Sequence, residues 1–239
     1  MNITQEISQE AMNSKMSSLA LETDAMGSEI YLALGLSELS KGIPEAPRVL
    51  SLLSLLLERY VQKNEKLMET TKKRGTITIF HGLRAPTLSI RQYIERIFKY
   101  SSCSPSCFVV AHIYLDRYLQ KVDVYLTSLN VHRLLITSVM IAAKFVDDAF
   151  FNNAYYAKVG GVSTAEMNSL EMDFLFSLDF RLHVTVDAFR RNCVQLEKEA
   201  SNAYPIERPI QVCGLKEGWQ SKGEVEDGAK FRRFSCGAV

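Results

Sequence analysis

The chain has 239 residues, 47% of them hydrophobic and 23% charged, which is enough apolar material for one compact domain and excludes a wholly disordered chain. The 28 basic residues nearly balance the 27 acidic ones, so general electrostatic binding of nucleic acid is not expected. No uncharged apolar run reaches the roughly 18 residues of a membrane helix, and residues 1–18 lack the pattern of a secretory signal. Five cysteines without a regular framework indicate a reducing compartment, so we expect the nucleus, the cytoplasm or both.

The first 86 residues are predicted to form two segments. Residues 1–43 are rich in Ser, Glu, Met and Asn and are expected to be mostly flexible, with one or two helical turns within 29–39. Residues 44–86 are expected to hold an N-terminal helix over 48–69, in which apolar residues recur at three- and four-residue spacing, and then a connection. The connection contains a β-branched stretch, but no second strand is present to pair with it.

Residues 87–200 show helical patterns in close succession. Helices are predicted over 89–100, 104–120, 130–146, 163–178 and 186–199. Several begin with a recognisable start signal: Ser104 precedes a proline, Asn130 is a good N-cap residue, and Ser163 with Glu166 forms a capping box. The third helix is apolar nearly all round, which places it in the middle of the domain. The expected fold class is therefore all-α, a single five-helix domain with an extra N-terminal helix, followed by a flexible tail over 201–239.

An acidic pair follows the third predicted helix. Asp147 and Asp148 resemble the beginning of an aspartate-rich metal motif, but a third carboxylate is missing because position 151 is Phe. The pair lies three and four residues after Lys144, so a local ion pair with that lysine is the favoured interpretation.

For the other motifs too, a structural role is favoured over ligand binding or catalysis. Gly160 and Gly161 precede a helix as a phosphate cradle would, yet the lysine and strand of a P-loop are missing, so a tight turn is favoured. Cys103 and Cys107 lack further zinc ligands, and the histidines have no catalytic partner at a suitable spacing. We therefore expect no metal, cofactor, small-molecule ligand or enzymatic activity.

Two charged residues stand out because they interrupt apolar helices. Lys144 follows Ala142 and Ala143, whose small side chains leave room for another backbone to approach, and Glu171 lies among Leu, Met and Phe residues. A charge at an apolar seam is unfavourable unless it is paired or functional. The residues alone leave both explanations open: structural pairing or snorkelling, or recognition of a partner.

Three runs resemble a cyclin box in their order along successive helices: Leu115-Asp116-Arg117-Tyr118-Leu119, Ala142-Ala143-Lys144-Phe145 and Leu170-Glu171-Met172-Asp173-Phe174-Leu175. The runs 130–138 and 153–163 more closely resemble the plant P-type cyclins, also called U-type, which are relatives of the yeast phosphate-pathway cyclins. The resemblance covers residues 45–200, with the cyclin box assigned to 87–200.

The resemblance implies a regulatory subunit that binds and activates a cyclin-dependent kinase, expected to be A-type-like, in cell-cycle or nutrient- or hormone-linked growth control. Lys144 would donate to carbonyls at the C-terminal end of the kinase's regulatory helix, where a cation is favoured. Glu171 would hold the ammonium in place, Phe145 would supply apolar contact, and Asp147 is assigned to the same kinase-binding surface. The alternative is a cyclin-fold, transcription-factor-like adaptor without kinase activation; a second repeat, a zinc ribbon and a basic face would favour it, and the sequence has none of them.

Four residues, Asp116, Arg117, Gly160 and Gly161, are assigned structural roles. Many mitotic cyclins carry a Met-Arg-Ala-Ile-Leu motif whose arginine pairs with the aspartate of the second helix, but the aligned residues 85–90 contain no such arginine. Docking of Arg-x-Leu substrates is therefore not expected. Asp116 needs another partner, either Arg117 or a backbone N–H.

Overall fold

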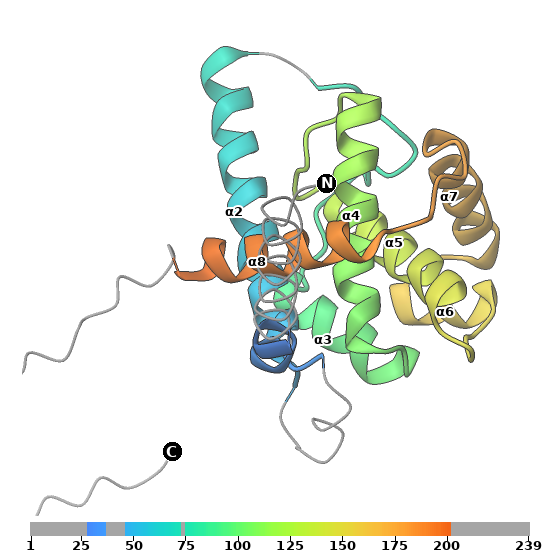
Figure 1. The fold of residues 1–239 in the computed structure, drawn as a ribbon. Coiled ribbons are helices and arrows are strands. Elements are labelled where there is room, and N and C mark those ends of the chain that lie inside the picture. The colour runs from blue at the N-terminus through green and yellow to red at the C-terminus, as the bar shows by residue number, and fades with distance from the viewer. Residues whose placement is uncertain (1–27, 37–45, 73–74, 202–239) are drawn as a thin grey trace, which may run out of the picture. The chain divides into compact units, whose positions relative to one another are not determined.

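The computed structural model describes residues 28–36, 46–72 and 75–201, and all regular structure in these ranges is helical. A short helix at 28–33 is followed by the elements labelled in Figure 1: α2 (Arg48–Thr71), α3 (Ile90–Ser101), α4 (Pro105–Val122), α5 (Val131–Val146), α6 (Asn153–Gly160), α7 (Thr164–Ser177) and α8 (Val186–Ser201). The all-α prediction is confirmed. The expected flexible stretches at 1–27, 37–43 and 202–239 lie outside the described residues.

Most helices begin close to where the sequence predicts. The Ser89 hydroxyl accepts a hydrogen bond from the backbone N–H of Gln92, whose side chain in turn accepts from the N–H of Ser89, so a complete capping box starts α3. Ser163 accepts from the N–H of Glu166 at 3.1 Å at the start of α7. Asn130 differs from the prediction, because its side chain accepts from Thr127 N–H and donates to the Tyr125 carbonyl. It holds the turn before α5 instead of capping the helix.

Helix α6 was not predicted, and the expectation of five helices between residues 87 and 200 is wrong because the structure has six there. The helix has only eight residues, too few to display a clear apolar periodicity. Its ends nevertheless carry standard signals. The Asn152 side chain accepts from Tyr155 N–H at 3.0 Å, and Gly161 ends the helix with a φ of +74°, in the left-handed region that glycine adopts most readily.

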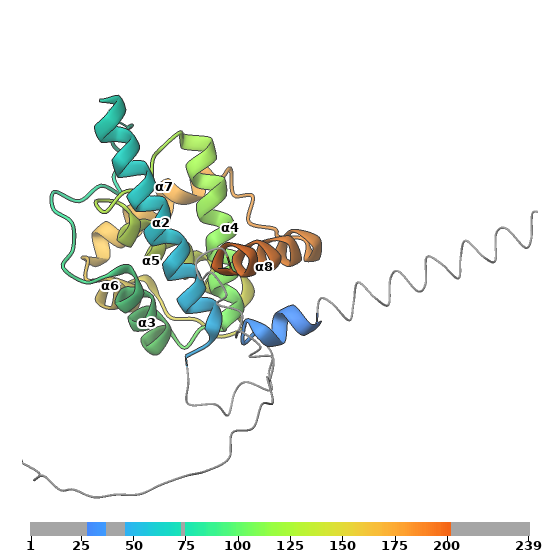
Figure 2. The same ribbon diagram turned by 90° about the vertical axis from the view of Figure 1, so that its left-hand side faces the viewer.

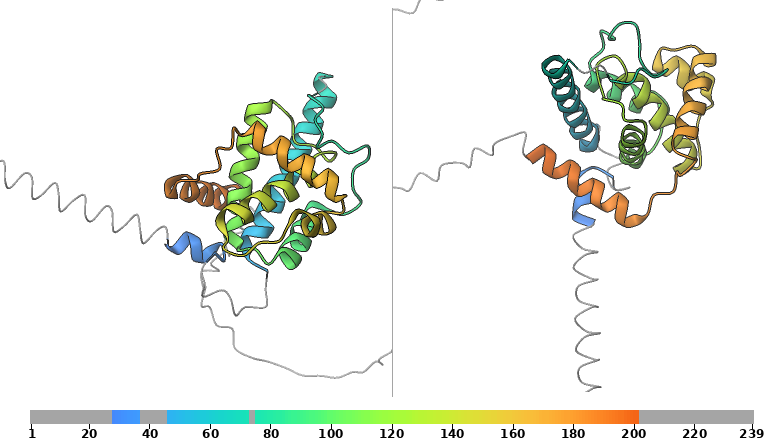
Figure 3. Two further views of the ribbon diagram at one scale, coloured as in Figure 1. Left: turned by 90° about the vertical axis from the view of Figure 1, so that its right-hand side faces the viewer. Right: turned by 90° about the horizontal axis from the view of Figure 1, so that it is seen from above.

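Helices α4 and α5 form the centre of the domain and pack against each other. Residues Phe108 to Leu115 of α4 are buried without interruption, and α5 is buried from Leu134 to Ala143. Helices α2 and α8 pack on α4, whereas α6 and α7 pack on α5. Figure 3, right, shows α2 and α6–α7 on opposite sides of the central pair. The predicted central position of the third helix is confirmed.

The N-terminal helix belongs to the same core. The apolar face of α2 packs on α3, α4 and α8, and Figure 2 shows α2 crossing in front of the other helices. The segment before it also contributes, because Leu34 is fully buried and its carbonyl accepts from the N–H of Val49 at 3.1 Å. The short helix expected within 29–39 is therefore present and anchored.

Candidate partner-binding site at the end of helix α5

Lys144 and Glu171 form an ion pair between α5 and α7. The Lys144 Nζ donates to Glu171 Oε1 at 2.6 Å and also to Asn153 Oδ1. The Asn153 amide donates to Glu171 Oε2 at 2.7 Å and to Asn168 Oδ1 at 2.8 Å. Each oxygen of Glu171 is thus used, while the described residues take up two of the three N–H donors of Lys144.

The pair is accessible from solvent. The side chain of Lys144 is 26% exposed and that of Glu171 is 16% exposed, so neither charge lies deep in the core. Charge-assisted hydrogen bonds of this kind are short and strong, and the asparagine fixes the geometry of both partners. Asn153 was missed at the sequence level because the helix that positions it was missed.

Asp147 does not pair with Lys144, so the predicted local ion pair is wrong. Its Oδ2 accepts from the backbone N–H of Ser104 at 2.9 Å, and its Oδ1 accepts from the Ser104 hydroxyl at 2.7 Å. Ser104 is the N-cap residue of α4, and Asp147 is the C-cap residue of α5. The carboxylate therefore joins the end of one central helix to the start of the other.

Large apolar side chains are exposed on the segments that carry this ion pair. Phe145 is 52% exposed beside Lys144, although it follows the most buried stretch of the chain. Further exposed apolar residues lie at the end of α5, in the connection to α6, on α7 and in the link after it: Val146, Phe150, Phe151, Met172, Phe176 and Phe180. We call these residues, with Phe145, the aromatic face. Large exposed apolar side chains are a common feature of protein-binding surfaces.

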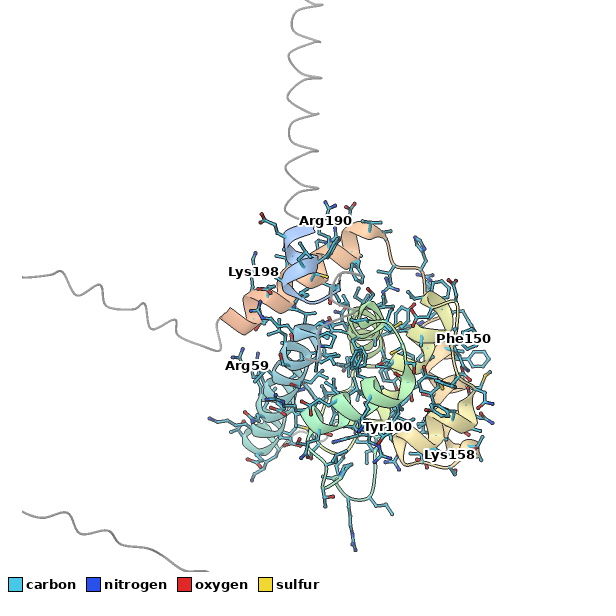
Figure 4. All side chains as sticks on the ribbon, turned by 90° about the horizontal axis from the view of Figure 1, so that it is seen from below. Arg59, Tyr100, Phe150, Lys158, Arg190 and Lys198 are labelled. Carbon is cyan, nitrogen blue, oxygen red and sulfur yellow. The ribbon has the colours of Figure 1, made fainter. Side chains whose placement is uncertain are left out.

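The aromatic face continues into two hollows. A groove of about 250 Å³ lies between α4, the end of α5 and the start of α8; it is lined by Ser106, Val110, Tyr114, Phe145, Val146, His183, Val184, Val186 and Phe189. A second hollow of about 500 Å³ is formed around Phe150, Phe151 and Tyr155, whose rings at 151 and 155 stack with centroids 3.9 Å apart. In Figure 4, Phe150 and Lys158 lie on the side of the domain opposite Arg59 and Lys198.

Arg117 fixes the link between α7 and α8, which forms one wall of the groove. Its guanidinium donates to the carbonyls of Arg181 at 2.9 Å and His183 at 3.1 Å. The hydroxyl of Tyr114 donates to the Leu182 carbonyl at 2.7 Å. The structural role predicted for Arg117 thus has a definite geometry, but Arg117 is not the partner of Asp116.

Asp116 lies beside a buried histidine. Its Oδ1 is 3.8 Å from His112 Nε2, one helical turn earlier, and His112 Nδ1 lies 3.1 Å from Asn192 Oδ1. Burial raises the pKa of Asp116, and the nearby His112 opposes that rise. Within the described part of the chain, neither expected partner, Arg117 or a backbone N–H, fills the place of the missing arginine. No catalytic partner was expected for His112, and the carboxylate near it, Asp116, lies one helical turn away because of the four-residue spacing.

Gly160 and Gly161 end α6 against α3. The hydroxyl of Tyr93 donates to the Gly160 carbonyl at 3.1 Å, and Arg96 Nε donates to the Val159 carbonyl at 2.9 Å. A methyl group added at Gly160 would lie 3.0 Å from Ile136 Cγ1. The predicted turn is present, and the close approach of three helices explains why the first glycine is needed.

Two general properties of the described residues bear on function. They contain no group of three or more His, Cys, Asp or Glu side chains placed to hold a metal ion. No helix in ranges 28–36, 46–72 and 75–201 is both long and apolar enough to cross a bilayer.

Comparison with known proteins decides the family. A sequence profile of the cyclin family matches residues 8–182, which is most of the chain. The chain belongs to the cyclin family. This cyclin is 62% identical to cyclin-P3-1 of Oryza sativa subsp. japonica over 185 residues, which cover 77% of the chain and 78% of that relative. It is 49% identical to cyclin-U3-1 of Arabidopsis thaliana over 209 residues, covering 87% and 95%.

A third relative supports the same subgroup. Cyclin-P4-1 of Oryza sativa subsp. japonica is 50% identical over 170 residues, which cover 70% of this cyclin and 79% of the relative. The resemblance to plant P-type or U-type cyclins is confirmed. The family is regulatory, and its association with the cell cycle and with a kinase partner holds for the family as a whole.

Proposed function

We propose that this cyclin binds and activates a cyclin-dependent kinase of the A-type-like class through the Lys144–Glu171 pair and the aromatic face. The observation that carries the proposal is that Lys144 is ordered by two partners yet keeps a donor and a quarter of its surface exposed. An ordered, accessible cation beside exposed aromatic side chains is suited to the C-terminal end of a helix, where backbone carbonyls lack intrahelical partners and the helix dipole is negative.

The apolar contacts would supply most of the binding energy. Phe145 projects next to Lys144 and also lines the groove of about 250 Å³, so one aromatic side chain belongs to both features. Buried aromatic residues at the centre of an interface are the common energetic hot spots, whereas exposed charge pairs contribute orientation. Lys144 would thus set the position of the kinase helix, and Phe145 would anchor it.

Activation follows if this cyclin binds more tightly to the active kinase conformation, in which the kinase's own lysine–glutamate pair is assembled, than to the inactive conformation. This cyclin itself would have no catalytic activity and would act in the nucleus, the cytoplasm or both, in growth control linked to division, nutrients or hormones. Fractionation of tagged protein from plant cells tests the location.

The experiment is a binding and activity assay with purified full-length variants and an A-type plant cyclin-dependent kinase. We expect Lys144→Ala and Phe145→Ala each to weaken binding by about tenfold or more, equivalent to at least ~1.4 kcal/mol, and to lower the stimulated phosphorylation of a peptide substrate. Lys66→Ala is the matched control, because Lys66 is an exposed lysine of α2.

Folding must be monitored, since Lys144→Ala leaves Glu171 without its cation. Phe145→Ala removes a half-exposed ring and should leave the melting temperature nearly unchanged. If both variants fold and still bind the kinase like the unmodified protein, the assigned surface is wrong. Binding without stimulated phosphorylation would favour the adaptor function instead.

A further inference from the structure

A largely buried polar cluster lies where the end of α3, the start of α4 and α6 meet, and the proposed kinase docking does not use it. Its members are Ser101, Cys103, Ser104, Cys107 and Tyr156. The Cys103 Sγ lies 3.0 Å from the Ser101 hydroxyl, and the Cys107 Sγ lies 3.4 Å from the Ser104 hydroxyl. The side chains of Cys103 and Cys107 also lie close enough for each to shift the pKa of the other.

The start of α4 brings these thiols together. Cys103 directly precedes the N-cap residue, and Cys107 is the third residue of the helix, whose backbone N–H donates to the Ser104 carbonyl at 3.0 Å, so the first turn of α4 brings the two cysteines near each other. Cys103 is 5% exposed and Cys107 is completely buried. Solvent therefore reaches Cys103 first.

The surroundings make the two thiols unequal. The nearby Cys107 thiol and the Ser101 hydroxyl lower the pKa of Cys103 against the effect of burial, whereas the nearby Cys103 thiol and burial raise the pKa of Cys107. The hydroxyl of Tyr156 is buried without a hydrogen-bond partner among the described residues, and burial, with a smaller contribution from the two thiols, raises its pKa. A pair with one thiolate-prone sulfur and one sulfur that keeps its proton is the arrangement in which one cysteine attacks and the other resolves.

We propose that Cys103 and Cys107 are an oxidation site that forms an internal, reversible disulfide in the presence of hydrogen peroxide. The Cys103 sulfur attacks one peroxide oxygen, the O–O bond breaks, and the products are a sulfenic acid on Cys103 and one water, which takes up the thiol proton. The Cys107 sulfur then attacks the sulfur of Cys103, forming the S–S bond, and the sulfenic hydroxyl leaves with the Cys107 proton as a second water. The two thiols lose two electrons and the peroxide gains them.

The disulfide has a structural consequence at Ser104, which lies between the two cysteines in sequence. An S–S bond of about 2.05 Å requires the two sulfurs to move together, which changes their contacts with Ser101 and Ser104. Ser104 also donates both of its hydrogen bonds to Asp147, the residue that follows Val146 of the aromatic face. Oxidation would therefore disturb the end of α5 and weaken kinase binding, an effect that rests on the proposed function.

The test maps the thiols directly. The full-length chain is used with Cys213→Ser and Cys236→Ser, since these two cysteines lie outside the described residues. After peroxide treatment, with glutathione in the same tube as a reference thiol, free thiols are blocked with N-ethylmaleimide under denaturing conditions and the chain is digested with trypsin. Both cysteines fall in the single peptide 100–117, and Cys193 falls in another peptide, which provides an internal control.

We expect peptide 100–117 to lose two hydrogens and to take up no N-ethylmaleimide, and we expect dithiothreitol to reverse both changes. Cys193, which is buried on α8, should stay labelled. Cys103→Ser and Cys107→Ser should each abolish the disulfide. Full labelling of the peptide after the glutathione has been oxidised, or equal oxidation of Cys193, would overturn the proposal.

A second measurement separates this proposal from the proposed function. Kinase binding is compared between the reduced protein, the oxidised protein and the Cys107→Ser variant treated with peroxide. We expect oxidation to weaken binding several-fold only when both cysteines are present. A mapped disulfide with unchanged kinase binding would contradict the regulatory consequence. A reduced protein that does not bind the kinase would contradict the proposed function, but it would not contradict the oxidation site.

Discussion

Asp147 joins the end of α5 to the start of α4 by accepting two hydrogen bonds from Ser104, at 2.9 Å from the backbone N–H and 2.7 Å from the hydroxyl. We predict that Asp147→Ala lowers the free energy of unfolding by about 1–3 kcal/mol, because two hydrogen bonds to a charged carboxylate are lost together. Urea unfolding measures the effect, with Asp148→Ala as the control because Asp148 is exposed.

The same variant also decides between two roles for Asp147. If Asp147→Ala unfolds at the same urea concentration as the unmodified protein but binds the kinase less well, Asp147 is a partner contact as the sequence assignment proposed. A loss of stability with an unchanged affinity of the folded protein would make it a structural residue.

Gly160 should not tolerate a side chain. We predict that Gly160→Ala lowers the free energy of unfolding by about 1–3 kcal/mol, because the added methyl group would be 3.0 Å from Ile136 Cγ1 and 3.2 Å from the Tyr93 hydroxyl. Gly161→Ala should lower it by about 1–2 kcal/mol for a different reason, since its φ is +74° and the space beside it is open.

Thermal or urea unfolding of the two glycine variants distinguishes these reasons. Combining Gly160→Ala with Tyr93→Phe should relieve part of the crowding, whereas Gly161→Ala with Tyr93→Phe should show no such relief. Equal unfolding curves for Gly160→Ala and the unmodified protein would show that α3 and α5 can move apart at this point.

His132 should make the fold less stable in mild acid. Its Nε2 donates to the Leu88 carbonyl at 2.8 Å, while its Nδ1 is buried without a hydrogen-bond partner among the described residues. Burial lowers the pKa of His132, and the bond to Leu88 opposes that change. The unfolded chain therefore binds more protons than the folded one just below about pH 6.5. The contribution of the neutral His132 to stability is fully present above that pH and is lost as the pH falls from there through the lowered pKa of the folded state.

Urea unfolding at several pH values between 8 and 5 checks this expectation. Burial lowers the pKa of His81 as well, so His132→Gln should reduce the acid sensitivity without removing it. The control is His183→Gln, because the His183 side chain is exposed. An unaltered pH profile for His132→Gln would mean that the imidazole does not drive the effect.

The fold was largely predictable because its long helices carry their own signals. Apolar periodicity located α2, and caps such as Ser89 and Ser163 marked where helices start. Helix α6 escaped because eight residues show little periodicity, although Asn152 and Gly161 mark its ends clearly. The N-cap residue and the glycine, nine positions apart, therefore indicate this helix better than its apolar pattern does.

The candidate site was predictable only in part. The unusual position of Lys144 and Glu171 in apolar helices identified both residues. Only the family resemblance predicted that these two residues, far apart in sequence, form a pair. Local spacing favoured Asp147 as the partner of Lys144, but Asp147 begins an extended backbone after α5, so the helical i to i+3 geometry no longer applies to it. Asn153 and Ser104, which fix the two acids, depend on tertiary packing that no sequence spacing shows.

The asparagine-held ammonium of Lys144 affects how quickly and how tightly a partner can associate. A free lysine side chain loses up to about 2 kcal/mol of rotamer entropy when it is immobilised. Here that loss occurs during folding, because Glu171 and Asn153 already restrict the side chain. A partner thus meets a preorganised cation, and little additional ordering opposes association at this residue.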